Sequence, residues 1–198
     1  MTASGPDPQA PRLAPVEEWD TDVAATLAKT IERDGTPLNV FTTLAHNPRL
    51  LKRVNVLGGL FLTRSSLPPR DRELVILRVG ARSLCDYEFG HHVLIGRQAG
   101  LTDDEIEAVA AVGDERDWPT ADAELLAFTD ELLDQCSLGD ETWEQLYLRF
   151  QPDQLVELVA LVGFYRMLCG VLNTCGVQRE AGVPGLPAVA VESEQRRH

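Results

Sequence analysis

The sequence predicts a single all-α domain, and three observations support this prediction. Apolar residues recur at helical spacing through most of the chain. Helix-start signals stand between the apolar stretches, and no alternating run bounded by hairpin turns is recognisable. With 198 residues, of which 44% are hydrophobic, the chain is long enough for one full-sized core. No internal repeat divides it.

Each expected helix has its own start or stop signal. Pro15 opens the first helix, and Gly35 offers its C-cap. Asn47 and Pro48 form an N-cap and first-turn pair for the next helix. A third helix is expected to start at Ser66 to Pro69, and a fourth is expected to run from Ser83 to a stop at Gly100. Thr102 and Glu105 form a capping box for a fifth helix, which stops at Gly113. Three more helices are expected to start near Pro119, Asp140 and Pro152.

The two ends of the chain differ in composition from the middle. Residues 1–14 are rich in Pro, Ala and Asp, and residues 182–198 are rich in Pro, Gly and charge. Such composition favours a flexible N-terminal arm and a C-terminal tail. The helical domain is therefore expected to span residues 15–181.

Charge and composition exclude several classes of partner. The formal net charge of −13 repels phosphate backbones and anionic lipid, so neither nucleic acid nor a membrane is an expected partner. The start of the chain does not read as a signal peptide, and the longest apolar run, "LVELVALVGFY", is short for a bilayer. A cytoplasmic protein is expected. Its four cysteines show no disulfide-scaffold spacing and no CxxC, so they are expected as thiols.

The stretch "LCDYEFGHH" places three reactive side chains on one helix face. At about 100° per residue, Cys85, Glu88 and His92 fall within roughly 60° of one another. A carboxylate and an imidazole four residues apart can share a hydrogen bond and relay a proton. Spacing alone is more typical of a solvated surface pair beside a buried packing cysteine. Glu73 is equally typical of a first-turn carboxylate that faces a helix dipole.

A longer pattern changes this balance. From about Asn39 to Gln178, the chain resembles the carboxymuconolactone decarboxylase and alkylhydroperoxidase D-like family. The motifs "LPPRDRELVILRV", "C.YE…H" and "AGLTDDEI" occur together and in order, which is more specific than any one of them. The resemblance implies an AhpD-like helical bundle that assembles as a homotrimer or homohexamer.

The resemblance also assigns candidate catalytic residues: Glu73, Cys85, Glu88 and His92. The peroxidase branch of the family has a Glu, a CxxC beginning twelve residues later, and a His four residues after the second Cys. Here Glu88 stands in the place of that second cysteine, so a sulfenic acid on Cys85 lacks its usual resolving thiol. The decarboxylase branch has Glu and His at the positions of Glu88 and His92.

The acid–base set is thus complete and the redox pair is not. The sequence therefore favours an enzyme that carries out decarboxylation or proton transfer on a small organic acid, lactone or related carbonyl compound. Glu88 and His92 are the expected acid and base, Glu73 orients or relays, and Cys85 lines the site.

Two alternatives stay open. One is a thiol-dependent peroxidase in which Cys85 uses a resolving thiol from elsewhere, such as Cys169 or Cys175, although packing is the commoner role for both. The other is a non-catalytic oligomeric protein that binds a ligand.

Three further residues are candidates for binding a small-molecule substrate: Arg78, Arg82 and Tyr87. A guanidinium can hold a carboxylate in a forked pair, although a salt bridge within the protein is the commoner role of an arginine. No cofactor is expected. A metal site from Glu73, Glu88 and His92 is less favoured than proton transfer, because HExxH and Cys/His ligand pairs are missing.

Overall fold

A computed structural model describes residues 10–111 and 116–190. The described residues form a helical domain with one small hairpin, which confirms the all-α prediction. In chain order the elements are α1 (Thr21–Leu27), β1 (Glu32–Arg33), β2 (Thr36–Pro37), α2 (Asn39–Leu44), α3 (Pro48–Thr63), α4 (Pro69–Arg82), α5 (Asp86–Gln98), α6 (Asp103–Ala110), α7 (Thr120–Gln135), α8 (Asp140–Arg149) and α9 (Pro152–Cys175).

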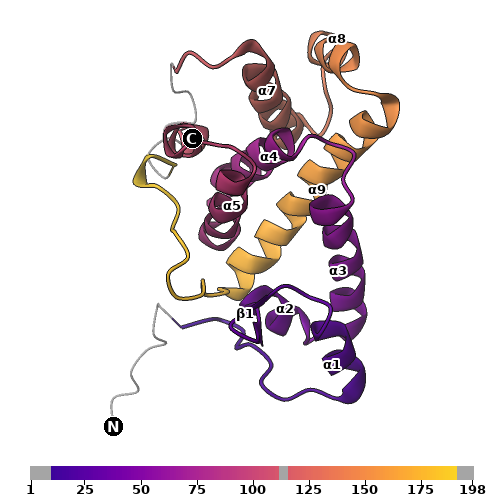
Figure 1. Ribbon diagram of the computed structural model, residues 1–198, viewed down its shortest axis with the longest axis vertical. Coiled ribbons are helices and arrows are strands. Elements are labelled where there is room, and N and C mark those ends of the chain that lie inside the picture. Colours follow the sequence, from indigo (N-terminus) through magenta and orange to yellow (C-terminus); the bar gives the residue numbers. More distant parts are fainter. Residues whose placement is uncertain (1–9, 112–115, 191–198) are drawn as a thin grey trace.

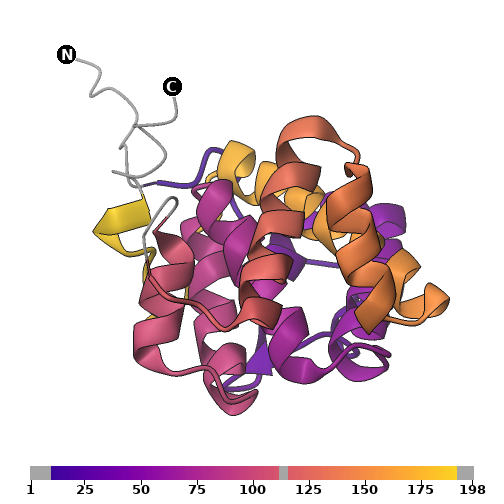
Figure 2. The same ribbon diagram turned by 90° about the horizontal axis from the view of Figure 1, so that it is seen from above.

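Helix α4 is the central element of the core. It packs against α5, α6, α7 and α9, and each of its residues from Asp71 to Arg82 is buried. Figure 1 shows α9 crossing the molecule beside α4 and α5, and Figure 2 shows the same helices from above. A helix buried on every face must pair its charged side chains. Arg72 accordingly contacts Glu73, and Arg78 contacts Asp130 on α7.

Most of the predicted helix starts are confirmed. Asn47 caps α3 by accepting a hydrogen bond from the backbone N–H of Leu50. Both halves of the predicted capping box between Thr102 and Glu105 are present at α6. Helices α7, α8 and α9 begin close to the predicted positions. Gly100 follows α5 with a φ of 99°, whereas Gly113 lies outside the described residues.

The prediction of one long helix from Pro15 to Gly35 is wrong. Helix α1 begins only after Asp20, which caps it, and it is followed by the β1–β2 hairpin. The two residues between the strands, Asp34 and Gly35, both have positive φ, at 53° and 75°. A two-residue loop of this kind favours Asp-Gly, which matches the twist of the paired strands. The expected absence of hairpins therefore fails at this turn.

The connection between α4 and α5 also differs from the prediction. Ser83 was expected to cap the second helix, but it ends the first. Leu84 then takes a left-handed conformation with a φ of 46°, and the amide of Cys85 donates to the carbonyl oxygen of Gly80. This is the hydrogen-bonding pattern of a Schellman C-terminus. Cys85 itself becomes the N-cap of α5.

The described parts of both chain ends pack on the domain. The amide of Leu13 donates to the carbonyl oxygen of Cys175. Residues 177–190, here called the C-terminal strap, run back beside α5 (Figure 1). A Cβ on Gly90 would lie 2.0 Å from the carbonyl oxygen of Pro184, so only glycine allows this approach. The strap is thus packed through residue 190, where the sequence predicts a tail.

Helix α9 is, among the described residues, the one helix long and apolar enough to cross a membrane by length and composition. Half of its apolar window is buried inside the domain. Its buried side includes Leu158, Leu161, Tyr165 and Cys169. This side faces α4 and α5, which carry the candidate catalytic residues.

Candidate active site

Glu73 is fully buried at the junction of three helices. Its Oε1 accepts a hydrogen bond from the Nε of Arg72 at 2.8 Å, and another nitrogen of Arg72 donates to the carbonyl oxygens of Phe61 and Leu62 at the end of α3. Its Oε2 lies 2.6 Å from the Nδ1 of His92 on α5. Burial acts to raise the pKa of Glu73, but His92 and Arg72 outweigh it and hold that pKa below its usual value. Glu73 is therefore a carboxylate with fixed partners.

His92 links Glu73 to Glu88. Its Nδ1 faces Glu73, and its Nε2 lies 3.2 Å from the Oε1 of Glu88, one turn earlier on α5. Burial opposes a positive imidazole, but the two carboxylates outweigh it and raise the pKa of His92 to about 9. At neutral pH the ring is thus protonated and donates from both nitrogens. The ring of Tyr165 packs against it in a T-shaped arrangement, with ring centroids 5.0 Å apart.

A cavity of about 560 Å³ opens beside this chain of groups. Most of its wall is apolar, with side chains from α2, α3, α5 and α9, such as Val40, Val54 and Leu168. Glu88 and His92 are part of the wall, whereas Glu73 lies behind His92. A proton can therefore pass between a molecule in the cavity and the buried Glu73 through His92, either directly or by way of Glu88.

Cys85 does not lie where the sequence places it. It is completely buried at the N-cap of α5 and is not part of the cavity wall. Its thiol is hydrogen-bonded with that of Cys169 from α9, which is also completely buried. The hydrogen bond with Cys85 and burial together raise the pKa of Cys169 well above its ordinary value. The two thiols form a pair behind the cavity wall.

Tyr87 is part of the cavity wall and also anchors the C-terminal strap. Its hydroxyl donates to the Oε1 of Glu180 at 2.9 Å and accepts from the backbone N–H of Val40 at 3.1 Å. Glu180 also contacts the Nε2 of His91 at 2.5 Å. Burial opposes the charge of Glu180, but His91 and the amide of Asn39 outweigh it and lower the pKa of Glu180 to about 2. Contact between Tyr87 and a substrate stays a prediction.

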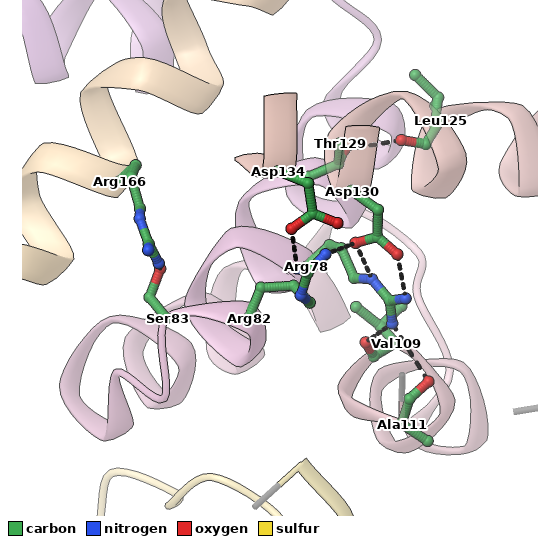
Figure 3. A network of polar contacts seen from close by, with 10 residues as sticks. All are labelled: Arg78, Arg82, Ser83, Val109, Ala111, Leu125, Thr129, Asp130, Asp134 and Arg166. Atoms are coloured by element: carbon green, nitrogen blue, oxygen red, sulfur yellow. Dashed lines mark hydrogen bonds and ion pairs between the residues drawn. The ribbon is translucent and has the colours of Figure 1, made fainter. Parts of the chain in front are cut away.

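Arg78 and Arg82 have protein partners in place of the expected substrate carboxylate. Arg78 forms a forked pair with Asp130 on α7, with distances of 2.9 and 2.7 Å, and also donates to the carbonyl oxygens of Val109 and Ala111. Arg82 contacts Asp130 and Asp134 (Figure 3). Both arginines are turned toward α7 and are absent from the wall that contains Glu88. The predicted role in substrate binding therefore does not fit their placement.

Sequence reasoning missed two residues of the site. Arg72 positions Glu73, and its only local signal is that it directly precedes this glutamate. Tyr165 lies in an apolar helix, where an aromatic residue reads as core. Within the described residues, no group of three or more His, Cys, Asp or Glu side chains is arranged to hold a metal ion.

Comparison with known families identifies this part of the chain. Residues 48–131 match the model of the carboxymuconolactone decarboxylase family. This segment belongs to that family. It contains Glu73, Glu88 and His92, so the carboxymuconolactone decarboxylase segment carries the whole relay, and the resemblance seen in the motifs is confirmed. No curated protein matches the chain.

Solved structures share the fold at low sequence identity. An uncharacterised peroxidase-related protein from Ralstonia eutropha JMP134 with an alkylhydroperoxidase AhpD core is 22% identical, with a TM-score of 0.74 over 85% of this chain and 92% of that chain. A peroxidase-related protein from Silicibacter sp. TM1040 is 17% identical, with a TM-score of 0.75 over 92% and 97%. The debrominase Bmp8, in complex with 2,3,4-tribromopyrrole, is 14% identical, with a TM-score of 0.69 over 94% and 97%. These likenesses show the AhpD-like fold.

Proposed function

We propose that the protein is an enzyme that transfers protons to and from a compact, mainly apolar organic acid, lactone or related carbonyl compound. The observation that carries the proposal is the hydrogen-bonded series Glu73, His92 and Glu88, which is buried at one end and reaches the cavity at the other. A glutamate–histidine pair on the surface would be solvated. Here Glu88 and His92 are both buried, and the carboxylate of Glu73 lies behind His92.

Each group has a role that follows from its contacts. Glu88 faces the cavity and takes a proton from the substrate carbon, or returns one. The imidazolium of His92 contacts Glu88 through its Nε2 and resupplies the proton. Glu73 keeps the ring positive and fixes its orientation. If the substrate bears a carboxylate β to a carbonyl group, the C–C bond breaks, carbon dioxide leaves, and the electron pair forms an enolate that the same pair protonates at carbon.

The cavity supports a substrate with an apolar body and one acidic end. Its wall is mainly aliphatic and aromatic, and it also includes the basic residues Lys29 and Arg33 from the segment around the hairpin. A cavity of about 560 Å³ is of the size that small-molecule sites have. The debrominase with the same fold, in complex with tribromopyrrole, likewise accommodates a compact ring.

The experiment is a test of proton exchange in deuterium oxide. Lactones, 2-oxo acids and 3-oxo acids are incubated with the protein, and mass spectrometry measures deuterium uptake at carbon and loss of carbon dioxide. On any compound that the wild type turns over, Glu88→Gln and His92→Gln should each lower the rate by about a hundredfold or more. The double variant should be hardly slower than the slower single variant, because the two groups act as a unit.

The matched control is Glu107→Gln, which makes the same change at an exposed carboxylate of α6 outside the cavity. It should keep the wild-type rate. Near-native rates in both Glu88→Gln and His92→Gln, with folding verified by circular dichroism, would end the proposal. Compounds that bind in calorimetry but are never turned over would favour the non-catalytic binding protein instead.

We also infer a homo-oligomer, with a trimer or hexamer expected. Large apolar side chains are exposed on three helices: Val56 and Leu60 on α3, Leu148 on α8, and Val156 and Met167 on α9. Contact with further copies would remove this surface from water. Sedimentation of a monomer at micromolar concentration would contradict this inference.

A further inference from the structure

The hydroxyl of Tyr165 has no hydrogen-bond partner among the described residues, although its side chain is buried. Tyr165 lies on α9, is only 2% exposed and is part of the cavity wall. Its hydroxyl is not one of the buried polar atoms that lack both a partner and accessible surface. The hydroxyl therefore keeps some accessible surface, and the space that Tyr165 borders is the cavity. An unpaired donor thus faces the site of the bound molecule.

Three neighbouring rings hold Tyr165 in place. His92 on α5 meets it in a T-shaped arrangement with ring centroids 5.0 Å apart, and Phe164 does the same at 5.2 Å. The ring of Phe61 on α3 lies at 6.5 Å. A phenylalanine could make the same ring contacts. Since a buried hydroxyl without a partner costs free energy, packing alone would favour phenylalanine at this position.

The surroundings of Tyr165 also keep its hydroxyl protonated. Burial, together with the negative charges of Glu88 and Glu73, holds the pKa of Tyr165 well above its ordinary value, and the charge of Arg72 opposes this only in part. A phenol in this state donates a hydrogen bond at every physiological pH and does not give up its proton. Its role therefore differs from that of the relay, whose members exchange protons.

We propose that the Tyr165 hydroxyl donates a hydrogen bond to a carbonyl oxygen of the substrate and stabilises the negative charge that this oxygen acquires during proton transfer. The inference rests on the proposed function and narrows it, because the substrate then carries a carbonyl group next to the carbon that loses its proton. The donor comes from α9 and the acid–base pair from α5, so the oxygen and the neighbouring carbon are contacted by different helices.

The step moves one proton and two electron pairs. Glu88 takes the proton from carbon, the C–H electron pair forms a C=C bond, and the π pair of the C=O bond moves onto the oxygen. Negative charge passes from the Glu88 carboxylate to this oxygen, so the total charge of the site is unchanged. Tyr165 keeps its own proton throughout. A donor that is fixed before the reaction stabilises the enolate oxygen more than the neutral carbonyl oxygen.

Binding of an enolate analogue tests the proposal without a known substrate. Glu88→Gln is the background, because its neutral amide resembles Glu88 after proton uptake. The ionised form of 4-nitrophenol is titrated into Glu88→Gln and into Glu88→Gln/Tyr165→Phe, with uncharged nitrobenzene as the comparison. Loss of the hydroxyl should weaken phenolate binding by about tenfold or more, because hydrogen bonds to charged groups are strong. Binding of nitrobenzene should change by less than about twofold, because the ring contacts remain.

The matched control is Tyr147→Phe in the same background, since Tyr147 is exposed on α8 away from the cavity. It should leave both affinities unchanged. Equal phenolate affinity with and without the Tyr165 hydroxyl would overturn the proposal, and so would phenolate binding to Glu88→Gln that is no tighter than nitrobenzene binding. Tyr165→Phe alone should be at least as stable as the wild type. A clear loss of stability would show that the hydroxyl binds the protein instead, which would also overturn the proposal.

Kinetics separate failure of this inference from failure of the proposed function. On a compound that the wild type turns over, Tyr165→Phe should lower kcat by about a hundredfold and change KM by less than about threefold. If Glu88→Gln and His92→Gln stop turnover while Tyr165→Phe keeps the wild-type kcat, the proposed function stands and this inference fails. If no compound is turned over, the proposed function fails, and the two phenolate affinities still decide whether Tyr165 binds an oxygen anion.

Discussion

Helix α4 carries two buried groups of charges that have different consequences. On one face, Arg78 and Arg82 meet Asp130 and Asp134 and join α4 to α7. On another face, Glu73 meets His92, which meets Glu88 at the wall of the cavity. Guanidinium and aspartate stay charged throughout the physiological range, so the first group can only hold helices together. The second group contains an imidazole and reaches a cavity, so it can also exchange protons.

Burial of charge is thus common to both groups and does not by itself indicate a catalytic site. What separates them is the presence of a titratable link and of space for a second molecule. Both criteria concern three-dimensional surroundings, since Arg78 and Glu73 are only five positions apart on one helix. The two groups can be tested separately, because each has partners that the other does not share.

The largest expected effect is on stability, at the arginine group. Asp130→Asn removes the carboxylate that both buried guanidiniums contact, and it leaves their charge incompletely compensated. Breaking a buried ion pair in this way costs about 3 to 5 kcal/mol. Chemical denaturation should show the free energy of unfolding falling by about that amount. Proton-transfer rates of the folded variant should change little, because the cavity wall is unaltered.

The matched control is Asp117→Asn, which makes the same change at an exposed aspartate near the start of α7. It should alter the free energy of unfolding by less than about 0.5 kcal/mol. Equal stability of Asp130→Asn and Asp117→Asn would mean that the arginine group does not hold α4 against α7.

A smaller effect is expected from the pH dependence of stability at the relay. Folding raises the pKa of His92 to about 9, above the value of about 6.5 for a free histidine. The folded protein therefore holds an extra proton between these values. Its stability from this source is fully present below pH 6.5 and is lost as pH rises through 9, at up to about 1.4 kcal/mol per pH unit. Denaturation midpoints measured from pH 6 to pH 10 should show this decline.

His92→Gln should flatten that decline, because glutamine does not titrate. His46→Gln is the control, since His46 is an exposed histidine outside the cavity. It should keep the wild-type pH profile. The same slope in the wild type and in His92→Gln would show that His92 is not held protonated by its two carboxylates.

Local patterns explain how much of the fold is predictable from the sequence. Asn47 and the pair Thr102 and Glu105 act on backbone groups three residues away, so their roles are visible in the sequence. The prediction of a helix from Pro15 to Gly35 is wrong because the helical spacing of apolar residues obscures the Asp-Gly turn. The prediction that Ser83 is an N-cap is wrong because Leu84 takes a left-handed conformation although it is not glycine. Where helix and turn signals lie within a few residues of each other, packing decides which structure forms.

The site residues likewise divide into those that local sequence patterns predict and those that depend on helix packing. Glu88 and His92 lie one turn apart on one helix, so helical spacing is enough to bring them together. The family motif supplies Glu73, which lies on another helix. The partners of Arg78 and Cys85 lie on α7 and α9, far along the chain, and no local spacing indicates them. Contacts of this kind depend on how helices pack, and the sequence alone left both assignments open.

The smallest expected effect concerns Tyr87, which both lines the cavity and holds a neighbouring segment in place. Its ring is part of the cavity wall, whereas its hydroxyl bonds to Glu180 of the strap and to the amide of Val40. Tyr87→Phe keeps the ring and leaves the Val40 amide without its acceptor. An unpaired buried donor costs about 1 to 3 kcal/mol, so the free energy of unfolding should fall by about 1 kcal/mol. Hydrogen exchange at Val40 should quicken accordingly.

Kinetics on a turned-over substrate then separate anchoring from binding. If the hydroxyl only anchors the strap, KM should change by less than about threefold, whereas loss of a substrate hydrogen bond of about 1.4 kcal/mol would raise KM about tenfold. Tyr147→Phe is the matched control, because Tyr147 is exposed on α8 away from the cavity. Unchanged stability together with a tenfold rise in KM would mean that the Tyr87 hydroxyl binds the substrate and does not anchor the strap. The relay would then have a neutral hydrogen-bond donor beside its acid–base pair.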